Sequence, residues 1–245
     1  MRALVLLSSI LLAASPLFAE DNVKTFPAQD LTSLHVEVGA GGVHVTASGT
    51  SAVEARVTDW DADKCTLTEE VQGKTLLLKL DAKRHWIFSA DCRAGLRVTA
   101  PAALPLAVNA GSGGVRVVGM TGALTARLGS GGLHGEDVSG PVNVKVGSGG
   151  VQLSGLRDTA SVMAGSGSVR LSWAAAPKRG SIDVKLGSGG ARLVFPKGTR
   201  LASTIVNGSG SVENAVTEDP AAPLKLSVIS GSGGVRVGYE EAARP

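Results

Sequence analysis

Basic side chains recur at one fixed position behind a Gly-Ser-Gly motif, which this 245-residue sequence contains seven times. The fifth residue after the first glycine of the motif is an arginine in four copies: Arg116, Arg170, Arg192 and Arg236. The other three copies have His134, Gln152 and Glu213 there, and an earlier glycine-rich corner has His44. If the copies stack in register, these side chains form a mainly basic row with a spacing of about 4.8 Å. Such a row could bind an anionic polysaccharide, lipopolysaccharide or an acidic partner protein, and it could equally be charge that keeps a sheet face soluble.

Other polar residues do not form a recognisable catalytic or metal site. His35, Glu37 and His44 would share an outer face across the first corner. Three mixed ligands on an exposed sheet without supporting side chains are typical of solvated polar residues. The motif serines do not lie in the Gly-x-Ser-x-Gly turn of serine hydrolases, and the corners lack the lysine and following helix of a phosphate-binding loop. The sequence therefore predicts no catalytic residue, no metal and no cofactor.

The spacing of the motif indicates how these residues are positioned. The motif begins at Gly111, Gly129, Gly147, Gly165, Gly187, Gly208 and Gly231, so the spacings are 18, 18, 18, 22, 21 and 23 residues. Self-similarity at such a period is typical of a stack of identical units, each burying its apolar face against its neighbours. Apolar and polar residues alternate on both sides of each corner, as they do in strands. The sequence therefore predicts an all-β solenoid with rungs of about 18–23 residues.

The alternation also predicts which side chains form the core. Apolar residues stand one, three and five positions before the first glycine: Ala110, Val108, Leu106; Leu128, Ala126, Leu124; Val146, Val144, Val142; Ala164, Val162, Ala160; Leu186, Val184, Ile182. They stand again four and six positions after it: Val115, Val117; Val151, Leu153; Val169, Leu171; Ala191, Leu193; Val235, Val237. Two copies keep only the first of these later positions, as Leu133 and Val212. Glycine is expected at the corners because a sharp turn requires a positive φ or a close backbone approach.

The start of the sequence indicates export. A short basic start, an apolar run over residues 3–14 and Ala19 at the cleavage position predict a signal peptide over residues 1–19. This run is too short to span a membrane, and no second apolar stretch follows it. The formal net charge is +3. We therefore expect an exported protein of the periplasm, the outer envelope or the secreted fraction, without a transmembrane segment.

The part before the regular repeats contains the only two cysteines, Cys65 and Cys92. An even number in an exported chain favours a disulfide, contributing about 3–4 kcal/mol, over two free buried thiols. Residues 20–100 are expected to form irregular β rungs and a cap, and residues 101–245 the repeat solenoid.

Three segments of this N-terminal part alternate as strands, namely residues 52–57, 75–80 and 96–99. Residues 59–70 and 81–91 are predicted to be loop excursions that carry Trp60, Trp86 and Phe88 to one end or flank. A first corner begins at Gly39, which precedes Gly111 by 72 residues, or four times 18.

Several of these segments resemble a known family. Residues 96–101, Leu-Arg-Val-Thr-Ala-Pro, residues 104–108 and the successive copies of Gly-Ser-Gly-Gly-Val-Arg-Val resemble the bacterial exported proteins grouped as putative adhesins, the family of unknown function 4097. The resemblance covers roughly residues 30–240. It implies a right-handed parallel β-helix-like solenoid, and it offers no catalytic residues to carry over.

These observations favour a non-enzymatic protein of the cell envelope or the secreted fraction, adhesin-like or scaffolding, which presents an extended β surface to a partner. That partner would be an envelope glycan, lipopolysaccharide or another envelope protein. The alternative is a polysaccharide-processing enzyme that acts on an anionic glycan on a β-helix scaffold. Such an enzyme would need clustered carboxylates, and the outward strand positions offer few acids, such as Asp183 and Glu213. Nucleic acid is not expected as a partner because the chain is exported and has only 3% aromatic residues for base stacking.

Overall fold

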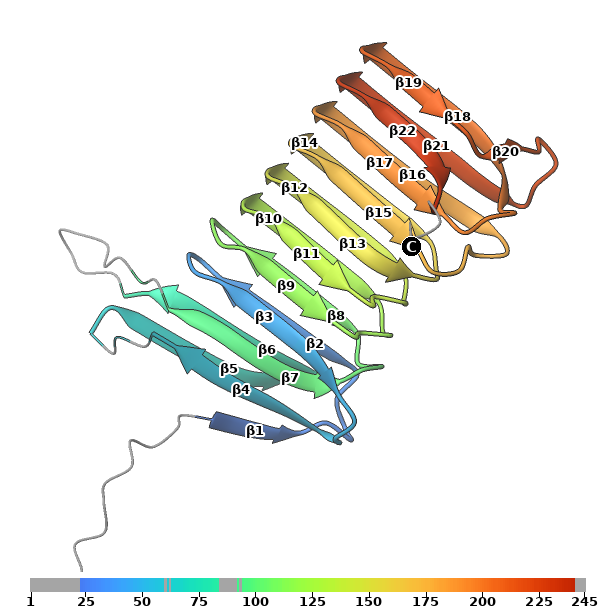
Figure 1. The fold of residues 1–245 in the computed structure, drawn as a ribbon. Helices are drawn as coiled ribbons and strands as arrows, with labels where there is room; N and C mark the ends of the chain where they lie inside the picture. Colours follow the sequence, from blue (N-terminus) through green and yellow to red (C-terminus); the bar gives the residue numbers. More distant parts are fainter. Residues whose placement is uncertain (1–22, 60, 62, 84–91, 93, 241–245) are drawn as a thin grey trace, which may run out of the picture.

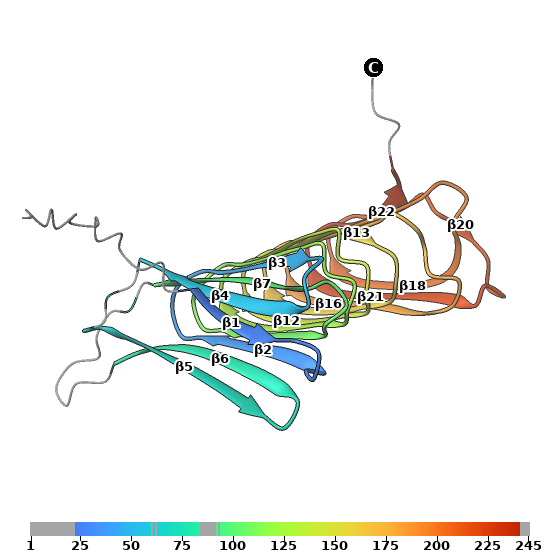
Figure 2. The same ribbon diagram turned by 90° about the horizontal axis from the view of Figure 1, so that it is seen from below.

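The computed structural model describes residues 23–59, 61, 63–83, 92 and 94–240, and these residues form strands and turns without a helix. The strands make two eleven-stranded sheets, which we name sheet A and sheet B, and which lie face to face as two layers (Figures 1 and 2). The all-β prediction is confirmed. No helix in the described part of the chain is long and apolar enough to cross a membrane. The predicted signal peptide lies outside the described residues.

The spatial order of the strands differs from their order in the sequence in both sheets. Sheet A consists of β1 (Val23–Pro27), β4 (Ala52–Thr58), β7 (Gly95–Pro101), β3 (Val43–Ser48), β9 (Val115–Val118), β11 (Leu133–Glu136), β13 (Val151–Leu156), β15 (Val169–Trp173), β17 (Ala191–Phe195), β22 (Val235–Tyr239) and β19 (Val212–Asn214). Sheet B consists of β20 (Thr217–Glu218), β18 (Arg200–Ser209), β21 (Leu224–Ser232), β16 (Gly180–Ser188), β14 (Ala160–Ser166), β12 (Val142–Ser148), β10 (Leu124–Ser130), β8 (Leu106–Ala110), β2 (Ser33–Val38), β6 (Thr75–Ala82) and β5 (Cys65–Gln72).

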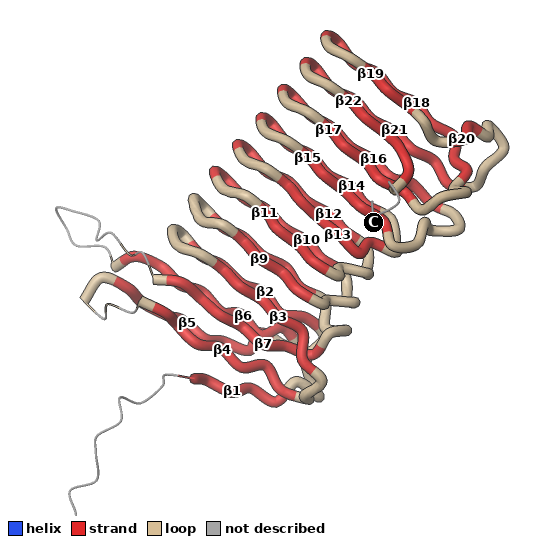
Figure 3. The backbone as a smooth tube through the Cα atoms, in the orientation of Figure 1, coloured by secondary structure: helices blue, strands red, loops and turns tan. Residues whose placement is uncertain are grey.

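Each copy of the repeat contributes one strand to each sheet. The strand that enters the corner belongs to sheet B and the strand that leaves it belongs to sheet A, and we call this pair a rung. Neighbouring rungs pair in parallel and in register, so that Val144 lies opposite Ala126 on one side and Val162 on the other. The corners consequently lie side by side along one long edge of the stack (Figure 3).

Close approach of stacked backbones explains the corner glycines. A Cβ atom on Gly111 would lie 2.2 Å from the carbonyl oxygen of Gly39, and one on Gly113 would lie 1.4 Å from that of Gly41. Gly149, at the same motif position as Gly113, also has a φ of 146°. The fourth residue of the corner is different, because a Cβ on Gly114 would meet nothing within 4 Å. The first and third positions of the corner therefore require glycine, for reasons that lie in the neighbouring rung.

The serines of the corners form a column. Ser130, Ser148, Ser166, Ser188, Ser232 and Ser209 lie in register in that order. The Ser166 hydroxyl donates to the Ser148 hydroxyl over 3.4 Å.

The predicted core lies between the two sheets. Every apolar residue expected to face the interior is buried except Val212, which is 49% exposed. The prediction for Val212 is wrong because β19 is the last strand of sheet A, so no further rung covers it among the described strands. Trp173 and Phe195 add a stacked aromatic pair to the core, with ring centroids 4.6 Å apart.

The order of the rungs in space differs from their order in the sequence at both ends. The last rung of the chain, β21 and β22, lies between the rung of β16 and β17 and the rung of β18 and β19. At the other end, the rung of β2 and β3 pairs directly with that of β8 and β9, with Leu34 opposite Leu106. Gly39 and Gly111 are 72 residues apart in the sequence, and they nevertheless belong to adjacent rungs.

The segment between these adjacent rungs builds the N-terminal end of the stack. β6 and β7 extend the parallel ladders, and β5, β4 and β1 then add antiparallel pairings at the edge. Residues 65–72 form strand β5, so the prediction of a loop excursion over residues 59–70 is wrong for its second half. β5 is recognisable only through its pairing with β6. Trp60, Trp86 and Phe88 lie outside the described residues.

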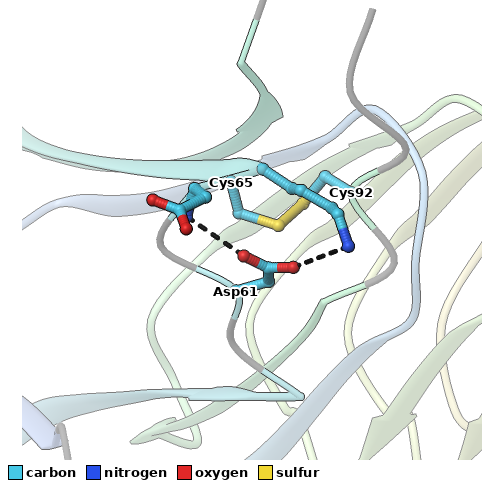
Figure 4. Close-up of a disulfide and its surroundings, with 5 residues drawn as sticks. Asp61, Cys65 and Cys92 are labelled. Carbon is cyan, nitrogen blue, oxygen red and sulfur yellow. Dashed lines mark hydrogen bonds and ion pairs between the residues drawn. A yellow bond between two sulfur atoms is a disulfide. The ribbon is translucent and has the colours of Figure 1, made fainter.

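The predicted disulfide between Cys65 and Cys92 is present (Figure 4). It joins the start of β5 to the segment that precedes β7, with the two Cα atoms 5.2 Å apart. Asp61 fixes the turn before Cys65: its carboxylate accepts from the backbone N–H of Asp63 and pairs with the Lys64 ammonium at 2.8 Å. The disulfide therefore connects β5 of sheet B to the segment before β7 of sheet A, at the end where the repeat is irregular.

Candidate basic surface on sheet A

The structure places the predicted basic row on the outer face of sheet A. The register gives the order His44, Arg116, His134, Gln152, Arg170, Arg192, Arg236 and Glu213. The side chains before Glu213 in this order point outward because their neighbours on each strand, such as Val169 and Leu171 around Arg170, are buried. The insertion of β22 before β19 brings Arg236 beside Arg192 and moves Glu213 to the end of the row.

Two further arginines extend the row and were missed in the sequence. Arg97 lies opposite His44, and Arg56 lies opposite Arg97. Their strands, β7 and β4, do not follow a Gly-Ser-Gly corner, so the motif count could not find them. Strand alternation in Leu-Arg-Val was the available signal for Arg97, but its place beside His44 depends on the pairing of β7 with β3.

Two glutamates neutralise part of the row. The carboxylate of Glu136 lies 2.7 Å from both the Arg116 guanidinium and the His134 imidazole, and Glu213 lies 2.7 Å from Arg236. The hydrogen bond with His134, together with the positive charge of Arg116, holds the pKa of Glu136 below its ordinary value. Arg170 and Arg192 are adjacent and have no ion pair among the described residues. They therefore form a centre of positive charge in the C-terminal half of this face.

The N-terminal half of the row is also positive around His44. Partial burial is the largest cause of the lowered pKa of His44, and the charges of Arg116 and Arg97 on either side lower this pKa further. Its ordinary value is 6.5, so His44 is less readily protonated than a free histidine. This shift is the effect expected where like charges surround a titratable base.

Two open hollows follow the row along sheet A. One, of about 430 Å³, is lined by Arg116, His134, Gln152 and Arg170, and the other, of about 610 Å³, by Gln152, Arg170, Arg192 and Arg236. Gly114, Gly132 and Gly150 line the first hollow, and Gly190 and Gly234 the second. Since glycine has no side chain, the surface beside the row is recessed and the guanidinium groups border it. An extended ligand could therefore lie along the stack axis in contact with several rungs.

The expected common face for His35, Glu37 and His44 does not exist. His35 and Glu37 belong to β2 in sheet B, where they lie 3.4 Å apart, whereas His44 belongs to β3 in sheet A. The corner between β2 and β3 turns their outward side chains to opposite faces of the molecule. Within the described ranges, no group of three or more His, Cys, Asp or Glu side chains could hold a metal ion.

The chain is similar to several solved structures. No protein-family model matches, and no curated protein matches. Among solved structures, a putative cell adhesion protein from Clostridium sporogenes ATCC 15579 is 12% identical, with a TM-score of 0.41, over 89% of this chain and 98% of that chain. Putative adhesins from Bacteroides fragilis NCTC 9343 and Parabacteroides merdae ATCC 43184 are 14% and 11% identical, with TM-scores of 0.39 and 0.33. These two matches cover 89% of this chain and 96% and 95% of the other chains.

Proposed function

We propose that this protein is a non-enzymatic, adhesin-like or scaffolding protein of the bacterial envelope or the secreted fraction, which binds an anionic glycan along the outer face of sheet A. The observation that carries the proposal is the in-register row on that face, with Arg170, Arg192 and Arg236 on three successive strands. The proposal includes the right-handed solenoid architecture of the family of unknown function 4097.

The spacing of the row favours an extended, repeating ligand. Successive strands lie about 4.8 Å apart, so the row offers one hydrogen-bonding side chain per rung in a straight line. A single exposed guanidinium contributes little in water, roughly 0–1 kcal/mol per ion pair. Several such contacts along one polymer act together, because binding at the first site places the next charge close to the next arginine. Acidic polysaccharides and the phosphorylated sugars of lipopolysaccharide have this repeating anionic chemistry.

The ion pairs on this face indicate which arginines are most available to a ligand. Arg116 and Arg236 already contact Glu136 and Glu213, and a ligand must compete with those carboxylates. Arg170 and Arg192 have no such competitor among the described residues, so they should contribute most to binding. The alternative of a glycan-processing enzyme gains no support from this face, because Glu136 and Glu213 are both held by cations.

The proposed compartment is outside the cytoplasm. A structural disulfide such as Cys65–Cys92 forms and persists in the periplasm or beyond the cell, where thiols are oxidised. The signal peptide predicted over residues 1–19 has the same implication.

The test compares two double variants of equal charge change. Arg170→Ser/Arg192→Ser removes the unpaired centre of the row, and Lys178→Ser/Arg179→Ser removes two exposed cations from the loop between β15 and β16. Binding to immobilised polygalacturonate and to lipopolysaccharide is measured at 20 to 300 mM salt. We expect the first variant to lose retention and the second to keep it, with parent binding falling as salt rises. Equal retention by both variants, or none by the parent at low salt, would overturn the proposal.

A further inference from the structure

A second line of outward side chains runs along sheet B and combines cations with exposed apolar groups. It consists of the residues two positions before the six corners from Gly129 onward, and we call it the mixed column; beyond Arg127 the same register continues with Asn109 and Glu37, which are not part of it. In spatial order its members are Arg127, Lys145, Met163, Lys185, Ile229 and Val206. The column crosses six strands, β10, β12, β14, β16, β21 and β18, and is about 24 Å long at a strand spacing of about 4.8 Å.

The apolar members of the column are unusually exposed. Six large hydrophobic residues are exposed among the described residues, and three of them, Met163 (46%), Ile229 (44%) and Val206 (54%), belong to this column. The other three, Val23, Val71 and Val212, lie on the edge strands β1, β5 and β19, and Val206 also borders an open edge because β20 pairs with β18 only at Arg200 and Leu201. The interior strands of sheet A have none. Exposed apolar side chains aligned in this way on one face mark an interaction surface more often than isolated ones do.

The surroundings of the column are positively charged. Arg127, Lys145 and Lys185 have no ion pair among the described residues. The next outward column over the same six strands consists of Thr125, Asn143, Ser161, Asp183, Ser227 and Thr204, which includes one acid. An open hollow of about 490 Å³ beside Arg127, Lys145 and Met163 is otherwise lined by corner glycines and by Leu128, Val146 and Ala164. The face therefore offers cations at the rim of a mainly apolar depression.

We propose that the mixed column docks this protein on an anionic lipid surface. Lysine and arginine near such a surface are attracted by the phosphate headgroups, and apolar side chains between them can enter the interface below the headgroups. Stable attachment to a membrane generally takes both kinds of contact, and the column provides both. A second copy of the chain packed with its column parallel to this one would be a poorer occupant, because that arrangement opposes the cations of the two columns.

This docking also gives the molecule an orientation. The mixed column is on the outer face of sheet B, and the row of Arg170 and Arg192 is on the outer face of sheet A, the opposite side of the two-layer stack (Figure 2). With sheet B on the lipid, the basic row of sheet A faces away from it. The two faces can therefore be tested separately.

The experiment is flotation of the purified full chain with vesicles of phosphatidylcholine alone or mixed with equal phosphatidylglycerol. We expect binding to the anionic vesicles only, and a loss on the order of a hundredfold in Arg127→Ser/Lys145→Ser/Lys185→Ser, since each cation near an anionic surface contributes about a fivefold factor. Met163→Ser/Ile229→Ser/Val206→Ser should also weaken binding, and its remaining binding should disappear at high salt. Circular dichroism checks that each variant keeps its β structure.

The control is Arg97→Ser/Arg170→Ser/Arg192→Ser, which removes the same charge from sheet A and should leave flotation within about threefold of the parent. Equal losses in the two charge variants would show attraction by net charge alone and would overturn the docking face. Absence of parent binding to anionic vesicles, or equal binding to neutral ones, would overturn it as well. Glycan retention by the variants is scored separately, so failure of lipid docking is distinguishable from failure of the proposed function.

Discussion

Replacing Gly113 by alanine should destabilise the stack strongly, whereas the same change at the next residue should not. A Cβ on Gly113 would lie 1.4 Å from the carbonyl oxygen of Gly41 and 2.5 Å from its carbonyl carbon. Both atoms are backbone of the neighbouring rung, so no side chain can rotate away to relieve the contact. A Cβ on Gly114 would meet nothing within 4 Å, and this residue does not have a positive φ. The two substitutions therefore separate the close approach from every general effect of replacing glycine.

The expected loss follows from what must move. Relief of the contact requires the two rungs to separate at the corner, where the Ser112 N–H donates to the Gly39 carbonyl over 3.2 Å and the Gly111 N–H donates to the Val38 carbonyl over 2.9 Å. Overpacking of a rigid site costs about 1–3 kcal/mol, and each backbone hydrogen bond contributes about 1 kcal/mol. We expect Gly113→Ala to lower the free energy of unfolding by about 3–5 kcal/mol.

The assay is thermal and urea unfolding of both variants, followed by far-ultraviolet circular dichroism. For a chain of this size the expected loss corresponds to a decrease of roughly 6–20 °C in Tm. Gly114→Ala should stay within about 0.5 kcal/mol of the parent or increase stability slightly, because alanine reduces the entropy of the unfolded chain. Similar Tm values for the two variants would refute the explanation of the corner glycines.

Three further predictions concern the core, the disulfide and pH. Val144→Asp places an unpaired carboxylate in the core and should cost several kcal/mol, whereas Lys145→Asp on the outer face should change stability by about 0.5 kcal/mol or less, and melts of both decide. Cys65→Ser/Cys92→Ser should lower stability by about 3–4 kcal/mol in urea unfolding. The bridge would be contradicted if the difference between parent and variant were no larger under non-reducing than under reducing conditions. The lowered pKa of His44 means that this site takes up a proton at higher pH in the unfolded chain than in the folded one, so the contribution of His44 to stability is complete above about pH 7.5 and is lost as pH decreases through 6.5. His44→Gln should reduce this loss of stability in melts between about pH 7.5 and 5.5. An unchanged pH dependence would contradict the assignment of the loss to His44.

The strands of the repeats and the side chains of their core could be predicted from the sequence. Both follow from the two-residue alternation around each corner, which is a local property, so Val144 and Lys145 are assigned to opposite faces without knowledge of the neighbouring rungs. The corner glycines could also be located, but the reason for them is the carbonyl of the adjacent rung.

The identity of the neighbouring rungs, in contrast, follows from the folded structure and could not be predicted. Strand pairing joins residues far apart in the chain, and the two irregular ends insert one rung between others, which no local pattern encodes. This insertion places Arg236 between Arg192 and Glu213, and it brings Arg97 beside His44. The mixed column of sheet B likewise depends on pairing, because Ile229 lies beside Lys185, and Val206 beside Ile229, only through the order of β16, β21 and β18. The charged and apolar side chains of each face therefore come from several strands, and the fold decides which of those strands are neighbours.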